Sequence, residues 1–401
     1  MLMIHPDPLV AQYDRWAYPQ PVEDLDDYRR RGGFDLSEPD RVWEKLWPQR
    51  PRTSELSILV AGCGTNQAAI IAHANPRHRV VGIDPSESAI QNHKVLRGRH
   101  SLVNLELLQA EIESVDYLDT EFDYIICTGV LHHLMAPDLA LNTLRRKLKR
   151  DGAMSLMLYG RHARVGVYMV QDALRSLGAG RTPEDCDLAR DVVTRLPPWH
   201  PASFYRDSAP DLRYEAGLVD TFLNARDRAY SIPELMDLVD GAGLRFHDWL
   251  DGLHYSPSAV FPPDAAILDR LETLPKAQQW HVVDLLTQRV GAHRFLVKRA
   301  DSTTTWGTVN VDAAWQDGTW LDLIPGLHPD ARLTPECDGL VLSREWHKVY
   351  FSNAEMGVIR AIDGTRAFRD ILPADPADLE FWSLMIPDLV EWGHVGLGPK
   401  R

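Results

Sequence analysis

Apolar residues in the first half of the chain follow two alternating patterns. Short continuous runs, typical of strands buried on both faces, alternate with longer segments in which apolar residues recur at helical spacing. The strand-like runs are Leu56–Ala61, Arg79–Ile83, Leu105–Leu108, Phe122–Cys127 and Ala153–Leu158. The helical segments between them are Gln67–Ala74, Glu87–Leu96 and Leu139–Leu148. This alternation predicts a parallel sheet with helices on its faces, which is a doubly wound α/β domain.

Residues 160–230 break the alternation and read as a helical insertion after the fifth strand. A capping box, Ser231-Ile232-Pro233-Glu234, then starts another helix. Leu244–Leu250 reads as a strand, and His293–Lys298 reads as its antiparallel partner after a helical excursion. The domain should therefore hold a seven-stranded, mostly parallel sheet.

The C-terminal quarter predicts a separate small unit. Thr303–Asp330 looks loop-like, and the strand pair Gly339–Leu342 and Lys348–Phe351 follows it. Three helices and a short strand come next, at Asn353–Ile362, Ala367–Ile371, Pro376–Glu391 and Gly393–Leu397. This order resembles a winged-helix-like α+β fold. We thus expect an N-terminal cap segment (1–50), an α/β domain (51–300) and a winged-helix-like domain (301–401).

Composition narrows the choice of partners and compartment. With 44% hydrophobic and 25% charged residues among 401, the chain is globular rather than disordered. A net charge of −14 disfavours broad nucleic-acid binding. One basic run, 145–150, is either a docking patch or, as we favour, a solvated helix end. Four scattered cysteines and no apolar span indicate no metal site, no membrane association and a cytoplasmic location.

The strongest local signal for chemistry is a glycine turn between a strand and a helix. The turn is Gly62-Cys63-Gly64-Thr65-Asn66, and glycines there allow a ligand to approach the backbone closely. The second strand ends in Asp84, twenty residues past Gly64. An acid at that place can accept hydrogen bonds from both ribose hydroxyls, although it can also cap the helix that begins at Pro85.

The turn lacks the third glycine of a dinucleotide fingerprint, because Gln67 stands in its place. It resembles instead the first motif of the class I S-adenosylmethionine (SAM)-dependent methyltransferases. Two later stretches extend the resemblance: 122–134 is similar to the fourth-strand motif, and 148–153 to the turn before the fifth strand. The resemblance covers 56–160 well and 231–299 more loosely, and it implies SAM as the cofactor.

The resemblance also implies roles for individual residues. The glycines lie under the methionine part of SAM, Asp84 binds the ribose, and Glu111 meets the adenine amine unless it is a plain surface charge. The cofactor-binding set is Tyr13, Ala61, Gly62, Cys63, Gly64, Asn66, Gln67, Asp84, Pro85, Ala110, Glu111, Ile112, Thr128 and Gly129. Tyr13 and Tyr18 resemble aromatic segments that fold over the cofactor. Two departures are Val60, where an acid is usual, and Asn66, where glycine is frequent.

Methyl transfer requires alignment of the acceptor and, where needed, removal of a proton. The candidates for these tasks are His132, His133 and Tyr159, although both histidines are equally compatible with structural roles. We expect transfer to a nitrogen or oxygen of a protein or peptide. A small-molecule methyltransferase with a C-terminal unit that forms a homodimer is the alternative. A non-catalytic SAM-binding protein on the same scaffold is a third reading.

Overall fold

A computed structural model describes residues 7–47, 50–302, 311–328 and 330–398. The chain divides into two compact units that interleave along the sequence. The first comprises residues 1–39, 55–250 and 287–303, and the second comprises 40–54, 251–286 and 304–401. Residues 40–54 and 251–286 thus group with the C-terminal residues, whereas the expected division falls at 50 and 300.

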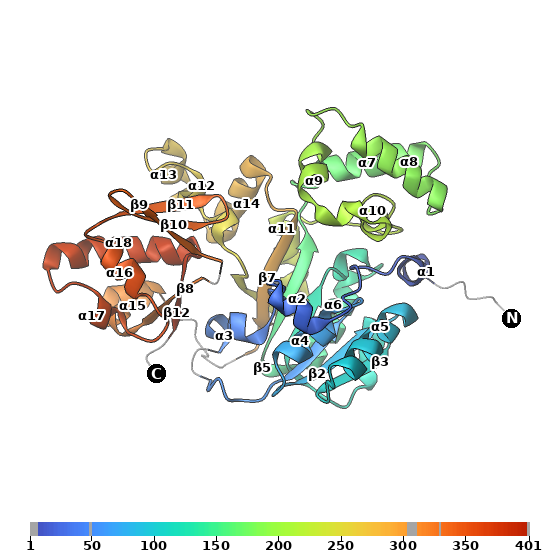
Figure 1. Cartoon of the computed structure of the whole chain (residues 1–401), viewed down its shortest axis with the longest axis horizontal. Coiled ribbons are helices and arrows are strands. Elements are labelled where there is room, and N and C mark those ends of the chain that lie inside the picture. Colours follow the sequence, from blue (N-terminus) through green and yellow to red (C-terminus); the bar gives the residue numbers. More distant parts are fainter. Residues whose placement is uncertain (1–6, 48–49, 303–310, 329, 399–401) are drawn as a thin grey trace. The chain divides into compact units, whose positions relative to one another are not determined.

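The first unit is built on a mixed seven-stranded sheet, as predicted (Figure 1). In spatial order its strands are β3 (Leu105–Gln109), β2 (Arg79–Asp84), β1 (Ser57–Ala61), β4 (Phe122–Thr128), β5 (Leu148–Tyr159), β7 (Ala292–Arg299) and β6 (Leu244–Trp249). The first five are parallel, and β7 runs antiparallel to both of its neighbours. Continuous apolar runs make β1 and β4 almost wholly buried.

The helices of the sheet form where predicted. They are α4 (Gln67–Ala74), α5 (Glu87–Arg99), α6 (Pro137–Lys147) and α11 (Ile232–Gly241), although α5 ends three residues later and α6 begins two residues earlier than expected. The capping box of Ser231 and Glu234 forms as predicted. The fifth strand is longer than predicted: β5 begins at Leu148, because Leu148 pairs with Phe122 before an irregularity in the register.

Two further groups of helices belong to the first unit. The predicted insertion is confirmed as α7 (Val165–Ser176), α8 (Pro183–Thr194), α9 (Ala202–Ser208) and α10 (Glu215–Phe222), the green group in Figure 1. These four helices share their own apolar core, which includes Val170, Leu174 and Phe222. The N-terminal segment contributes α1 (Pro8–Arg15) and α2 (Leu25–Arg30). We refer to residues 7–39 as the N-terminal strap.

The second unit combines small antiparallel sheets with helices. Strands β9 (Arg332–Glu336), β10 (Gly339–Arg344) and β11 (His347–Ser352) form one sheet, and β8 (Ile324–Leu327) pairs with β12 (Val395–Gly398). Its helices are α3 (Pro39–Leu46), α12 (Pro257–Val260), α13 (Ala266–Glu272), α14 (Lys276–Thr287), α15 (Val311–Asp317), α16 (Met356–Ala361), α17 (Phe368–Ile371) and α18 (Pro376–Glu391). Trp320, Phe368 and Trp382 lie in its core.

Residues 303–330 were predicted to form a loop, and this was wrong for most of the described part, which contains α15 and β8. Residues 303–310 and 329 lie outside the described residues. Burial explains why these residues form regular structure, since Trp320 is only 7% exposed and Trp315 packs against the same core. Asp375 caps α18 as predicted, by accepting from the amide of Ala377. The winged-helix-like assignment stays a prediction.

Candidate active site

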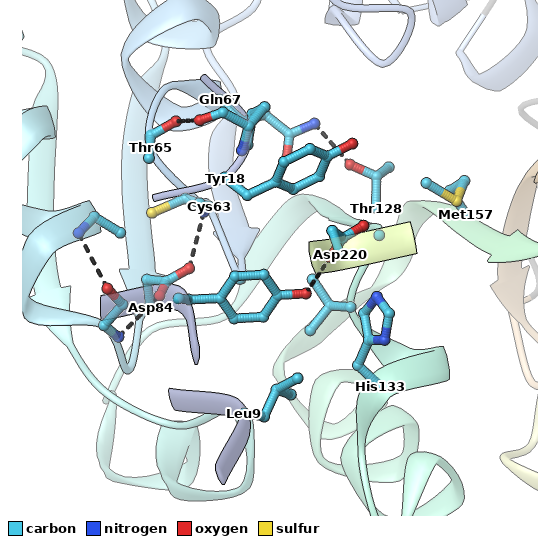
Figure 2. Close-up of a pocket in the computed structure, with 18 of the residues that line it drawn as sticks. Leu9, Tyr18, Cys63, Thr65, Gln67, Asp84, Thr128, His133, Met157 and Asp220 are labelled. Carbon is cyan, nitrogen blue, oxygen red and sulfur yellow. Dashed lines mark hydrogen bonds between the residues drawn. The ribbon is translucent and has the colours of Figure 1, made fainter. Parts of the chain in front are cut away.

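The ends of the parallel strands converge on one large cavity. The glycine turn follows β1, and Asp84 and Thr128 are the last residues of β2 and β4, so all three lie at one edge of the sheet, where the carboxyl ends of parallel strands meet. These residues line a cavity of about 860 Å³. In Figure 2, Asp84 lies on one side of this pocket, and Asp220 and His133 lie on the other. One cavity therefore joins a nucleotide-like site to a second group of polar side chains.

The glycine turn is required by its conformation and by its neighbours. Gly62 and Gly64 have φ values of +70° and +53°, a region that side chains with a Cβ rarely adopt. A Cβ on Gly62 would come within 2.4 Å of Val130, and one on Gly64 within 3.2 Å of the Tyr18 carbonyl oxygen. The turn is thus held between the end of β4 and the N-terminal strap.

Asp84 is a buried carboxylate held in a fixed orientation. One carboxylate oxygen accepts from the amide of Gly64 at 2.8 Å, and the other accepts from the amide of Ser86 at 2.9 Å. Burial raises the pKa of Asp84 to about 6, against the lowering effect of these two bonds. The helix cap proposed as an alternative is supplied by Ser86, whose hydroxyl accepts from Ala89. Since a carboxylate has about four acceptor positions, Asp84 keeps two for ligand hydroxyls.

Asn66 ties the glycine turn to the strap. Its side-chain oxygen accepts from the amide of Val22, and its nitrogen donates to the carbonyl of Gln20, both at 2.8 Å. The neighbouring Thr65 hydroxyl donates to the Pro19 carbonyl at 2.6 Å. The residue that departs from the family's glycine therefore has a structural purpose, because a glycine could not make either bond.

The strap also reaches Ser86, the residue that caps α5. The Ser86 hydroxyl donates to Asp14 at 2.7 Å. The preceding residue, Tyr13, points instead toward the far end of the cavity, where its phenol donates to Asp220 at 2.8 Å. Two consecutive residues of α1 thus contact opposite ends of the cavity.

Asp220, on α10, is the centre of the second polar group. Besides Tyr13, it accepts a hydrogen bond from the Tyr159 phenol at 3.1 Å and a longer one from Asn224 at 3.3 Å. Asp220 is only 2% exposed, and burial raises its pKa. Burial and the Asp220 carboxylate also raise the pKa of Tyr13 and Tyr159 well above the ordinary range, so both phenols remain protonated donors.

A buried ion pair supports this end of the cavity. Arg164 contacts Asp227 at 3.1 Å, with side chains 1% and 0% exposed. The Arg164 guanidinium also lies 3.7 Å from the centre of the Tyr159 ring, a cation–π contact. Gln171 donates a further hydrogen bond to Asp227 at 3.0 Å. The pair thus fixes the ring of Tyr159 against the insertion.

The two candidate histidines occupy different environments. His133 lines the cavity, and its Nδ1 lies 2.7 Å from the Arg226 carbonyl oxygen, so Nδ1 carries the proton and Nε2 keeps a lone pair. His132 does not line the cavity: its ring packs 3.8 Å from that of Tyr159. Burial holds the pKa of His132 well below its usual range. Of the two, only His133 is placed to meet an acceptor.

Most of the residues predicted from the sequence lie together. Those that line the cavity are Tyr13, Gly62, Cys63, Gly64, Asn66, Gln67, Asp84, Pro85, Glu111, Ile112, Thr128, Gly129, His133 and Tyr159. Ala61 and Ala110 lie next to lining residues: Ala61 is the last residue of β1, and the Ala110 amide donates to the Asp84 carbonyl. Sequence analysis missed Asp220 and Arg164. The sequence signal for Asp220 was its position in the mostly apolar stretch 218–222, because a carboxylate is rarely buried unless it has a partner.

The basic run 145–150 spans the end of α6 and the first residues of β5, and its cations make intramolecular contacts. Arg146 pairs with Asp116 and Lys149 with Asp123. Arg145 and Lys147 donate to the carbonyls of Gly243 and Leu118, and Arg150 to that of Asp301.

Among the described residues, one group has metal-like spacing: Asp26, His73 and His100. His100 Nε2 accepts from the Leu25 amide at 3.1 Å, so Nδ1 carries the proton of the neutral ring and faces Asp26. That nitrogen offers no lone pair to an ion. In the described part of the chain, no helix is long and apolar enough to cross a membrane.

Comparison with known proteins agrees with this geometry. Residues 52–176 match a family model described as a methyltransferase domain. The matched segment contains the glycine turn, Asp84 and the β4 motif. The chain therefore contains a methyltransferase domain, built on the seven-stranded sheet of the class I fold.

Several individual proteins are similar to this methyltransferase. An uncharacterized protein, syc1184_c of a Synechococcus strain, is 26% identical over 305 residues, covering 72% of this chain and 71% of that protein. A tRNA U34 carboxymethyltransferase of Shewanella loihica is 32% identical over 136 residues, so the match spans 32% of this chain and 41% of that enzyme. The structure of PKMT2 from Rickettsia typhi in complex with AdoHcy has a TM-score of 0.67 at 14% identity, over 91% of this chain and 76% of that one. The last likeness shows that the fold extends beyond the cofactor-binding part.

Proposed function

We propose that this methyltransferase binds SAM between the glycine turn and Asp84 and transfers its methyl group to a nitrogen or oxygen of a protein or peptide. The observation that carries the proposal is the single cavity that joins Asp84 to Tyr159, His133 and Asp220. A cofactor held at one end presents its reactive atom toward the other. The same cavity can then hold the acceptor in line with it.

The residues present fit SAM. Gly62 and Gly64 line the cavity and place no side chain in it, and Asp84 has acceptor positions left for ribose hydroxyls. Glu111 and Ile112 line the cavity beyond Asp84 and are suited to the adenine. When bound, SAM supplies a methyl group already activated by its positive sulfur. The chain itself has to orient the acceptor, exclude water and receive a proton.

These tasks fall to the other end of the cavity. Arg164 and Asp220 hold the Tyr159 ring from two sides. The Nε2 lone pair of His133 is available to receive a proton from an acceptor, because its Nδ1 proton is engaged by the Arg226 carbonyl. The ring of His132 packs against the ring of Tyr159, and His132 takes no part in proton transfer.

A protein or peptide acceptor is supported by the second unit. It has a core of its own, with Leu342, Phe351 and Ile386 nearly inaccessible to solvent. An appended unit of domain size is unexpected in an enzyme that methylates only a small metabolite. We propose that it recruits the acceptor; the alternative is a dimerisation surface, with a small molecule as acceptor.

A tRNA acceptor is less consistent with the chain. The match to the tRNA U34 carboxymethyltransferase spans only 32% of this chain and 41% of that enzyme, so it does not carry the acceptor across. The net charge of −14 opposes a phosphate backbone, and the basic run 145–150 is occupied by internal contacts.

The test combines cofactor binding with a transfer assay. S-adenosylhomocysteine (SAH) should bind the purified protein in calorimetric titration, whereas NAD should not. With isotopically labelled SAM and a cell lysate, label should enter the protein or peptide fraction. Label that appears only in small molecules or in RNA would contradict the proposed acceptor class, and failure of SAH to bind would contradict the cofactor site.

A further inference from the structure

The acceptor end of the cavity has an unusual charge distribution. Its central group is the Asp220 carboxylate, whose hydrogen-bond donors are two phenols and an amide, all uncharged. Among the described residues, no lysine, arginine or histidine forms an ion pair with Asp220. A buried carboxylate without a cationic partner is unfavourable, so a missing cation is the expected complement.

The basic residues that line this end of the cavity are engaged elsewhere. Arg164 pairs with Asp227, and Arg226 pairs with Asp7 at 3.1 Å. The Nδ1–H of His133 donates to the Arg226 carbonyl. Arg294 lines the cavity but is exposed to water. None of these side chains forms an ion pair with Asp220 in the described structure, and the nearby ring of His133 only partly offsets the effect of burial on the pKa of that carboxyl.

We propose that Asp220 selects an amine as the methyl acceptor, held between the rings of Tyr13 and Tyr159. This inference rests on the proposed function, and it narrows the acceptor from nitrogen or oxygen to an amine nitrogen. Carboxylate and aromatic rings together form the environment that proteins use for ammonium groups. An acceptor carboxylate would instead meet the like charge of Asp220.

The reaction itself favours the same assignment. The bound ammonium first gives a proton to His133 or to water, and the amine nitrogen then gives its lone pair to the methyl carbon as the carbon–sulfur bond breaks with its electron pair on sulfur. Positive charge therefore moves from sulfur to nitrogen, which ends as a methylated ammonium. Asp220 stabilises this developing charge, and such preorganised groups give large rate effects. A hydroxyl acceptor that has lost its proton would be neutral at the end of transfer and would not benefit.

Three probes that share one alkyl chain test the selection: n-butylamine, n-butanol and butyrate. Each is titrated into the SAH-bound protein, and each is offered as acceptor with labelled SAM. The amine should bind saturably and take up label, whereas the alcohol and the acid should do neither. Absence of saturable amine binding, or preference for either other probe, overturns the inference.

Variants separate selection by charge from a structural role. Asp220→Asn keeps the shape but removes the charge, and should weaken amine binding at least about tenfold while SAH affinity stays the same. Tyr13→Phe removes one hydrogen bond but keeps the charge, so the preference for amine over alcohol should remain. Asp172→Asn, at a carboxylate that is 76% exposed on α7, is the matched control and should behave like wild type.

The outcomes distinguish this inference from the proposed function. If Asp220→Asn loses SAH together with the amine while Asp172→Asn does not, Asp220 supports the cofactor and the selection is refuted. Equal losses of amine preference in Asp220→Asn and Tyr13→Phe would also refute it, because they indicate packing rather than charge. Failure of the wild-type protein to bind SAH would count against the proposed cofactor site instead.

Discussion

Asn66 provides the sharpest test of how the strap takes part in cofactor binding. Its side chain is 4% exposed and makes two hydrogen bonds of 2.8 Å to the strap backbone, at Gln20 and Val22. A third contact, from Asn92 at 3.3 Å, holds the amide in place. Replacing Asn66 by alanine removes both links to the strap and leaves the glycines unchanged.

The size of the effect follows from the two bonds. Each contributes about 1 kcal/mol net, since water can satisfy the freed backbone groups once the strap lifts. The closed strap should thus lose about 2 kcal/mol relative to the open one. If closure contributes fully to cofactor binding, SAH affinity falls roughly thirtyfold. Tyr13, which the strap delivers to Asp220, should lose order at the same time.

Two measurements on the same proteins check this expectation. Calorimetry gives the SAH dissociation constant, and hydrogen exchange reports on the amide of Val22, which Asn66 protects in the wild type. Asn142→Ala is the control, because Asn142 makes a comparable side-chain bond within α6, to the Asp138 carbonyl. The control should match the wild type in both measurements.

A folded Asn66→Ala protein with wild-type SAH affinity and unchanged exchange at Val22 would contradict this expectation and leave Asn66 a purely local role in the turn. Faster exchange with unchanged affinity would show that Asn66 holds the strap but that closure of the strap does not contribute to binding.

Three other predictions concern charge and backbone. Because burial raises the pKa of Asp84 to about 6, SAH affinity should fall as the pH drops below about 6, and Asp84→Asn should abolish that dependence in calorimetry. Because the folded state binds this proton more tightly than the unfolded chain, protonated Asp84 stabilises the fold in acid, and this contribution is lost as the pH rises through about 6. Gly64→Val should weaken SAH binding at least roughly tenfold, since φ is +53°, and wild-type affinity would contradict this. Asp227→Asn should lower the free energy of unfolding by about 3–5 kcal/mol in urea, by leaving Arg164 buried without a partner; a negligible change would argue against the pair.

The sheet was predictable because its signals are local. Continuous apolar runs such as 122–127 identify strands buried on both faces, and glycine or acid at their ends identifies the loops. The second unit was harder, because β8 pairs with β12, some 70 residues later in the sequence. No local pattern reveals such a pairing, so 303–330 read as a loop from its Gly and Asp content.

The same distinction divides the active site. Gly62, Gly64 and Asp84 stand on loops whose strands are adjacent in the sheet, so their spacing in the sequence carries the information. Asp220 reaches Tyr13 across 207 positions, and no sequence motif links the two residues. The choice between the two histidines was open for a similar reason: His133 lines the cavity and His132 packs against Tyr159, and only the packing of Tyr159 decides which ring is covered.

The cofactor motifs are local in the sequence and the contacts of Asp220 are not, which explains why similarity to other methyltransferases points to the cofactor and not to the acceptor. The part of the chain that matches the methyltransferase domain ends at residue 176, within α7, whereas Asp220 and Asp227 lie beyond it. The proposed acceptor end is thus assembled largely from the insertion rather than from the sheet and its glycine turn. Helix α1 of the strap links the two ends of the cavity, because it contacts Ser86 next to Asp84 and also Asp220. Changes in α10 should therefore alter acceptor preference with little effect on SAM affinity, whereas changes in α1 should alter both.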